Sequence, residues 1–454
     1  MKHSNGFSRR DLFRMSLAAT GALAATGSFL FGGSSRAGSA GVARRFVQIN
    51  LTGGWDSAYA TDPIVGSKRE SPVYDPSHLL EALMPKAVDV KPTLVMGPGM
   101  IPAENAFARM PTAFVNGMFM EVSSHDFATQ YMSSGHLSLS NTRDYPAIPA
   151  LLGADSAIFP PHVVVGLPIP LGVTRDTAPP LYTQGIDALD RIIGRPGSAE
   201  IAPGELLDHF TEQQVEDANA LIEALDKNVY DRLPRSHRNA LANWRSSSSR
   251  IEEIYQLGLA GTLVPTPDDE ARYGAPGGVN DLGPARMLAS LYRLMVSNLC
   301  PYITTNFSSF DTHSNQLAVH LPLMQQFAAA LDVFVTDLLE TEDPAAPGYS
   351  LAETTTLFIT SEFVRTPMFS TTGGTEHWQS ASAILMGRGV QDGAVIGATN
   401  DNAEAIGWDP EGGGPGSEPL LPAHLIATIL ANVGTEAHAD TVSTTRIAGL
   451  FEEA

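Results

Sequence analysis

The sequence predicts an α/β fold in which a mostly parallel sheet is sandwiched by helices, with a separate helical insertion. Short apolar runs of strand length alternate along the chain with longer segments whose apolar residues recur at intervals of three and four. Of the 454 residues, 43% are apolar, which is enough to pack a large core. We therefore expect one globular domain over residues 41–454.

The first forty residues are expected to be a twin-arginine signal peptide. Arg9 and Arg10 precede an apolar run over 15–31, and small residues before position 40 suit a signal peptidase. The alternative is an uncleaved membrane anchor, but the run is rich in Ala, Gly and Thr and is weakly hydrophobic for a stable span. We expect the twin-arginine translocase as an export partner, a periplasmic or extracellular location, and no stable membrane span in the mature chain.

Charge and cysteine content exclude two classes of function. Without residues 1–40 the chain keeps 23 Lys and Arg against 48 Asp and Glu, a net charge near −25. Such a field repels nucleic acid and anionic lipid, although solubility outside the cytoplasm is the better explanation of the charge. The single cysteine, Cys300, ends an apolar helical pattern and is expected to be a buried thiol, so cysteine chemistry is not expected.

The first half of the mature chain contains apolar runs with the length of buried strands. They cover 45–51, 91–97, 113–123 and 162–167. The first run leads into Gly53, Gly54 and Asp56, the position where open α/β sheets build their sites. A helical pattern over 126–134 follows the third run and places Ser123 or Ser124 near a helix N-terminus.

The second half continues the alternation after a region of different character. Residues 203–261 read as charged amphipathic helices with little strand signal, which predicts a helical insertion. Further helices are predicted at 284–299, 317–338 and 421–433, strands at 302–307, 355–360 and 381–386, and a loop at 411–416. This order is typical of a parallel sheet covered on both faces.

Acidic and histidine residues follow the predicted strands, and we expect them to share a metal. The candidates are Asp56, Asp311, His313, Glu362 and His377, each placed at the carboxyl end of a strand. This oxygen and nitrogen set favours zinc, with Mn, Mg or Ca as further candidates, calcium less readily because it prefers oxygen alone. Taken singly, each residue has a structural alternative as a cap, a turn residue or a hydrogen-bonded histidine.

Ser124 is the candidate nucleophile. A hydroxyl at a helix N-terminus beside a cation has a lowered pKa, although Ser124 as a simple N-cap is the alternative and Ser123 is an equal candidate. His125 is expected to orient substrate or a ligand, or else to be a buried hydrogen-bonded ring. Arg365 is a candidate clamp for an oxyanion, with surface pairing as its alternative. No G-x-S-x-G elbow surrounds either serine, and nucleotide-binding glycine motifs are missing from the sequence.

Five motifs resemble the DUF1501 family in sequence and in order. They are LTGGWD from Leu51, Ser124-His125, FDTHSNQ from Phe310, SEFVRT from Ser361 and GTEH from Gly374. The family looks like a branch of the alkaline phosphatase and sulfatase superfamily, whose members use divalent metals on phosphate and sulfate esters.

The resemblance implies a role for several positions. By position, Asp56 resembles the first metal aspartate of the superfamily, Ser124 the nucleophile, and His377 the last metal histidine. Asp311 with His313 resembles the aspartate and histidine pair, and Glu362 the acid of a second pair.

The expectation is an exported, metal-dependent hydrolase of phosphate or sulfate esters that acts on a small-molecule or polymer substrate. In this chain Glu362-Phe363 stands where the superfamily has a second aspartate and histidine pair. This departure motivates the alternative, a catalytically degenerate binding protein of the cell envelope with the same alkaline phosphatase-like fold.

Overall fold

The protein is represented by a computed structural model, which describes residues 44–63, 85–140, 145–154, 156, 160–166, 180–183, 265–274, 283–400 and 402–452. The chain divides into two compact units, and all described residues belong to the unit formed by 41–156, 160–187 and 263–454. The predicted signal peptide, 1–40, and the predicted helical insertion, 203–261, lie outside the described residues.

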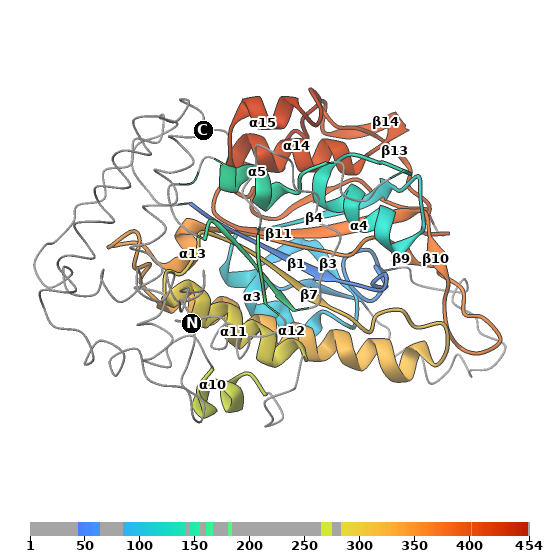
Figure 1. Cartoon of the computed structure of the whole chain (residues 1–454). Coiled ribbons are helices and arrows are strands. Elements are labelled where there is room, and N and C mark those ends of the chain that lie inside the picture. The colour runs from blue at the N-terminus through green and yellow to red at the C-terminus, as the bar shows by residue number, and fades with distance from the viewer. Residues whose placement is uncertain are drawn as a thin grey trace, which may run out of the picture. The chain divides into compact units, whose positions relative to one another are not determined.

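An eight-stranded sheet forms the centre of this unit (Figure 1). Its strands, in spatial order, are β12 (Ala394–Ile396), β4 (Thr112–Phe119), β11 (Ser380–Gly387), β8 (Thr355–Thr360), β1 (Arg45–Leu51), β7 (Tyr302–Phe307), β5 (His162–Gly166) and β6 (Leu181–Thr183). All neighbours pair in parallel except β11, which runs antiparallel to both β4 and β8. The fold is therefore mixed α/β with a mostly parallel sheet, as the sequence predicts.

The central strands β1, β7 and β8 confirm the predicted runs 45–51, 302–307 and 355–360 residue for residue. Every residue of β1 and β8 is buried, as expected for strands that are covered on both faces of the sheet. In the register, Asn50 of β1 lies opposite Asn306 of β7 and Thr360 of β8. The carboxyl ends of these strands, and that of β4, therefore reach the same edge of the sheet.

Helices cover both faces of the sheet (Figure 1). One layer contains α4 (His125–Ser134), α5 (Ile148–Ala154), α14 (Pro422–Val433) and α15 (Glu436–Asp440). The other contains α3 (Glu104–Arg109), α11 (Pro284–Val296) and α12 (Gln316–Glu340). A buried cluster that includes Phe46, Met118, Phe358 and Ile429 packs under the first layer. On the other face the rings of Phe307 and Phe327 meet at 5.7 Å.

The long helix α12 confirms the predicted pattern over 317–338. Among the described helices it is long and apolar enough to cross a membrane by length and composition alone, a test that core helices also pass. In this structure its residues Met324, Phe327, Leu331 and Phe334 are fully buried in the protein core. Cys300, just after α11, is buried as expected.

Smaller elements complete the described part and correct two predictions. They are η2 (Ile101–Ala103), α10 (Pro267–Arg272), α13 (Leu351–Thr354) and three antiparallel pairs, β2 (Lys86–Val88) with β3 (Lys91–Met96), β9 (Val364–Arg365) with β10 (His377–Trp378), and β13 (Gly407–Asp409) with β14 (Gly414–Pro419). The predicted strand at 91–97 exists as β3 but pairs outside the main sheet. The predicted loop at 411–416 already contains the start of β14, because glycines permit a tight hairpin there.

Candidate metal centre

The residues that follow β1, β4, β7 and β8 meet at one edge of the sheet. His377 differs from the prediction, because it lies in β10, just before β11, and not at the carboxyl end of a strand. Since β11 is antiparallel to β8, its first residues lie at the edge where the parallel strands end. His377 therefore reaches the site from the opposite chain direction.

Two glycine motifs allow three loops to approach one another closely. A Cβ atom on Gly53, whose φ is +119°, would lie 2.2 Å from the backbone nitrogen of Asp311. A Cβ atom on Gly374 would lie 1.9 Å from the carbonyl carbon of His313. Because no side chain fits at either position, glycine is required there. The approach lets the Thr375 amide donate to the Thr312 carbonyl at 3.1 Å.

Three histidine rings converge on the carboxylate of Asp311. Its Oδ1 atom lies 3.0 Å from His313 Nε2 and 3.1 Å from His377 Nε2, and its Oδ2 atom lies 3.4 Å from His125 Nε2. His125, Asp311 and His377 each offer one ligand atom, and these three atoms all lie within 4.8 Å of one another. The Asp311 side chain is 45% exposed, so the cluster is open to solvent.

The second nitrogen of each ring is held by a hydrogen-bond acceptor. His125 Nδ1 lies 2.7 Å from Glu362 Oε1, His313 Nδ1 lies 2.8 Å from Glu376 Oε2, and His377 Nδ1 lies 2.9 Å from the carbonyl oxygen of Ser123. Acceptors of this kind on Nδ1 are typical of metal-binding histidines. Each Nε2 atom lies 3.0–3.4 Å from the Asp311 carboxylate, where it donates to that carboxylate when it carries a hydrogen and could bind a cation beside it when the hydrogen is on Nδ1. This donor set fits a divalent metal such as zinc.

Arg365 stabilises Asp311 from the buried side. Its Nε donates to the Gly54 carbonyl and its Nη1 to the Thr375 carbonyl, both at 3.0 Å, while its Nη2 contacts Asp311 Oδ1 and the Gly53 carbonyl. Each of its three nitrogen atoms is thus bonded to the protein. Arg365 therefore holds Asp311 and the loop of Gly53 and Gly54 in place. These contacts give no evidence for the predicted role of Arg365 as an oxyanion clamp.

The hydrogen bonds shift the pKa of two groups in opposite directions. Burial alone would raise the pKa of Asp311, but the bonds from Arg365 and His377 outweigh it and lower this pKa to about 2. The hydrogen bond to Glu362 raises the pKa of His125 above its ordinary value. Asp311 is therefore ionised at neutral pH and attracts a cation.

Glu362 lies behind His125 rather than inside the cluster. It is 3% exposed, and its Oε1 accepts from the Gly53 amide at 2.8 Å while Oε2 accepts from the Ser361 hydroxyl at 2.9 Å. The next residue, Phe363, packs its buried ring 5.1 Å from the ring of His125 and 4.5 Å from that of His377. The Glu362-Phe363 pair thus shapes and orients the histidines from behind.

Asp56 belongs to a separate buried network. Its Oδ2 accepts from Gln316 Nε2 at 2.7 Å, and its backbone amide donates to His320 Nε2 at 3.0 Å. The Nδ1 atom of His320 lies 3.0 Å from the hydroxyl of Thr312. Of the predicted metal residues in the described part, the structure therefore brings together Asp311, His313 and His377, but it places Asp56 elsewhere.

Ser124 is the N-cap of α4 and stands directly before His125. Its hydroxyl makes no capping hydrogen bond, and the residue is exposed. Ser123 contributes through its carbonyl, which accepts from His377.

Glu376 is a site residue that the sequence interpretation missed. It lies inside the GTEH motif, directly before His377, and its carboxylate contacts His313. Its position beside a predicted ligand is the signal that was available.

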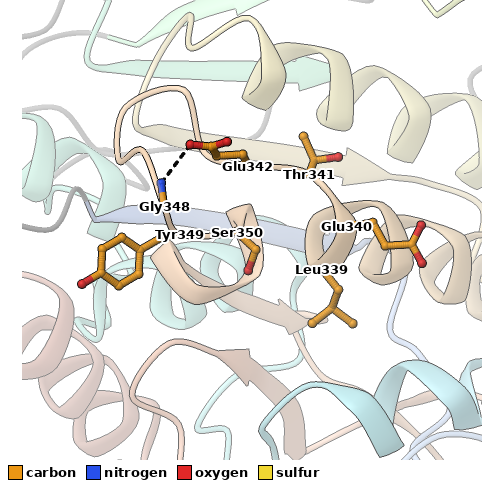
Figure 2. A pocket seen from close by; sticks show the side chains of 7 residues that line it. All are labelled: Leu339, Glu340, Thr341, Glu342, Gly348, Tyr349 and Ser350. Carbon is orange, nitrogen blue, oxygen red and sulfur yellow. Dashed lines mark hydrogen bonds between the residues drawn. The ribbon is translucent and has the colours of Figure 1, made fainter.

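Two surface hollows lie away from the cluster. One, of about 240 Å³, is lined by residues 339–342 and 348–350 between α12 and α13; Figure 2 shows the bond of 2.8 Å from the Gly348 amide to Glu342. The other, of about 310 Å³, lies beside β3, β4 and β12 and includes Asp62 and Asn116. Neither contains a residue of the histidine cluster.

Comparison with known proteins gives a family match and remote structural likenesses. The model of the family DUF1501, described as a protein of unknown function, matches residues 275–446, which include Asp311, His313 and His377. This match supports the resemblance to DUF1501. A search of curated proteins gives no match.

One of the structural likenesses is to a solved structure titled "Crystal structure of Ps i-CgsB in complex with k-i-k-neocarrahexaose". The sequence identity is 12% and the TM-score is 0.36, with 89% of this chain and 75% of that chain covered. At this level the likeness assigns neither a fold family nor an activity.

Proposed function

We propose that this chain is a hydrolase of phosphate or sulfate esters that uses one divalent cation, with His125, Asp311 and His377 as its inner ligands and His313 as a fourth donor. The observation that carries the proposal is the convergence of three imidazole Nε2 atoms on one ionised carboxylate. We further propose an alkaline phosphatase-like fold and, from the twin-arginine pattern, a periplasmic or extracellular location.

The surroundings favour one cation rather than two. Glu362 is bonded to the Gly53 amide and to His125, Asp56 is bonded to Gln316, and Phe363 has no ligand atom. A mixed nitrogen and oxygen set suits zinc or manganese, and less readily magnesium or calcium. Zinc can expand to five ligands, which keeps a position for the ester oxygen.

The cation would supply charge stabilisation and polarise the ester oxygen. Ser124 lies beside the cluster at the N-terminus of α4, where backbone amides favour an anionic group. Its hydroxyl oxygen bonds to phosphorus or sulfur, the bond to the ester oxygen breaks, and the leaving alcohol carries away the serine proton. Water then releases phosphate or sulfate and restores the hydroxyl.

The first experiment tests Ser124 directly. Ser124→Ala should lower the hydrolysis of a nitrophenyl phosphate or nitrophenyl sulfate by roughly 10³-fold or more, because the attacking oxygen is lost. Its free energy of unfolding should change by no more than about 0.5 kcal/mol, because the hydroxyl makes no capping bond.

Chelation of the wild-type protein should give the same loss of turnover, and added Zn²⁺ or Mn²⁺ should restore it. Inactivity toward both esters with Zn²⁺, Mn²⁺, Mg²⁺ and Ca²⁺ in turn would contradict the proposal.

The second candidate function is a binding protein of the cell envelope without catalysis. The observation that favours it is the contact between Arg365 and Asp311, which supplies a positive partner from the protein itself. Elemental analysis separates the candidates, since a protein that contains no metal and takes none up supports the binding protein.

A further inference from the structure

The three imidazoles of the cluster are supported very unequally. His377 is held by a backbone carbonyl, and His125 is held by Glu362, which is 3% exposed and has further hydrogen bonds. His313 is held by Glu376, whose side chain is 61% exposed. His313 itself is 44% exposed, so its orientation depends on one solvent-facing carboxylate.

We propose that Glu376 is a positioning residue that orients His313 toward the cation site. The inference rests on the proposed site, and it assigns a role to a residue outside the predicted ligand set. A carboxylate accepts hydrogen bonds, so its contact of 2.8 Å favours the tautomer of His313 with the hydrogen on Nδ1. In that tautomer the Nε2 lone pair lies on the side of Asp311 Oδ1, 3.0 Å away, where the proposed cation would bind.

The backbone delivers Glu376 to this position. Its carbonyl accepts from the Thr366 amide at 2.9 Å, and its amide lies 3.0 Å from the Thr366 hydroxyl. The same segment is joined to the loop of His313, because the Thr372 hydroxyl donates to the His313 carbonyl at 2.9 Å. These hydrogen bonds hold the backbone of Glu376 and that of His313 in place independently of the contact between their side chains.

The alternative is that Glu376 and His313 form only an exposed ion pair, which contributes little to stability. The positioning role and the ion-pair role predict different metal affinities when Glu376 is replaced. An exposed pair would leave metal affinity unchanged, whereas the loss of a partner that orients a metal-binding histidine typically weakens metal binding by about 10 to 100-fold.

The test measures Zn²⁺ affinity by competition with a chromogenic chelator. The proteins compared are the wild type, Glu376→Ala, Glu376→Gln, His313→Gln, and the double variant that combines Glu376→Ala with His313→Gln. Glu376→Ala should weaken binding by about 10 to 100-fold, and Glu376→Gln, which keeps an acceptor, should restore part of it. Glu418→Ala removes an exposed carboxylate on β14 and should bind as wild type does.

The double variant shows whether Glu376 acts through His313. It should bind Zn²⁺ no more weakly than His313→Gln alone, because the orienting carboxylate has nothing left to orient. Nitrogen NMR of the metal-free protein should also show His313 with its hydrogen on Nδ1, and a redistribution in Glu376→Ala.

The outcomes separate the inference from the proposed function. Wild-type protein that binds no Zn²⁺ overturns the proposed cation site itself. If the wild type binds Zn²⁺ and Glu376→Ala binds it equally tightly, the role of Glu376 is overturned and the cation site stands. The same holds if the losses of Zn²⁺ affinity in the two single variants add up in the double variant.

Discussion

Asp56 and Asp311 follow neighbouring strands at the same edge of the sheet, yet their carboxylates lie in opposite surroundings. Asp56 is fully buried and accepts from the amide of Gln316 and from the backbone of Ala58. Asp311 is 45% exposed and faces three imidazoles and Arg365. The first environment supplies neutral donors, whereas the second supplies three imidazoles and a guanidinium.

The difference shows that an aspartate at the end of a strand does not face the histidine cluster by virtue of its position alone. Each region contains an aspartate and a histidine, but His320 accepts from the Asp56 backbone through Nε2, the atom that His313 and His377 point at Asp311. The network of Asp56 therefore joins the end of β1 to α12. In the cluster of Asp311, the Nε2 atoms of His313 and His377 lie against the carboxylate instead.

Paired isosteric substitutions give the largest expected contrast. Asp311→Asn should weaken Zn²⁺ binding by more than about 100-fold, because it removes the charge on which the imidazoles converge. Asp56→Asn should keep the wild-type affinity and instead lower the free energy of unfolding by about 1–3 kcal/mol, because an amide donor meets a donor in the buried network. Chelator competition and urea unfolding measure the two effects. Equal loss of affinity in both variants would return Asp56 to the ligand set.

A glycine substitution tests how closely the loops must approach. Gly374→Ala would place a methyl group 1.9 Å from the carbonyl carbon of His313, so we expect a loss of about 1–3 kcal/mol in stability together with weaker Zn²⁺ binding. Gly414→Ala is the matched control, since nothing lies within 4 Å of its Cβ position. Wild-type Zn²⁺ affinity in Gly374→Ala would show that His313 reaches Asp311 without this contact.

The last prediction concerns a buried imidazole outside the site, for which no carboxylate contact is seen among the described residues. His162 of β5 is fully buried, its Nε2 lies 2.9 Å from the Thr304 hydroxyl, and burial lowers its pKa to about 3. The folded state therefore binds this proton less readily than the unfolded state, whose value is 6.5. The stability contribution is present above pH 6.5 and is lost as the pH falls toward about 3, at no more than about 1.4 kcal/mol per pH unit.

Urea unfolding between about pH 7 and about pH 4 checks this slope against His162→Gln. The variant should lose stability less steeply than the wild type on acidification. Parallel slopes would show that another group dominates the acid response.

The central sheet was predictable from sequence, because its strands are short segments rich in apolar and β-branched residues. That signal located β1, β7 and β8 to the residue. The direction of a strand has no such signal, so the antiparallel course of β11 and the entry of His377 from its start were missed.

The candidate site was predictable in its motifs but only partly in its roles. Asp56 and Asp311 both follow a strand and stand near glycines, and nothing local distinguishes them. Their partners come from distant segments, since Gln316 lies 260 residues from Asp56 and Arg365 lies 54 residues from Asp311. Tertiary contacts of this kind decide which carboxylate is bonded internally and which remains available.

The place of β11 in the sheet also affects how the chain is synthesised. This late strand lies between β4 and β8, which both precede it in the sequence, so a ribosome-bound chain that ends before it has two open inner strand edges. His377 arrives with the same segment. The residues of the proposed cation site are therefore all present only when the gap in the sheet is filled, while the edge strand β12 and the helix α14 still follow in the sequence.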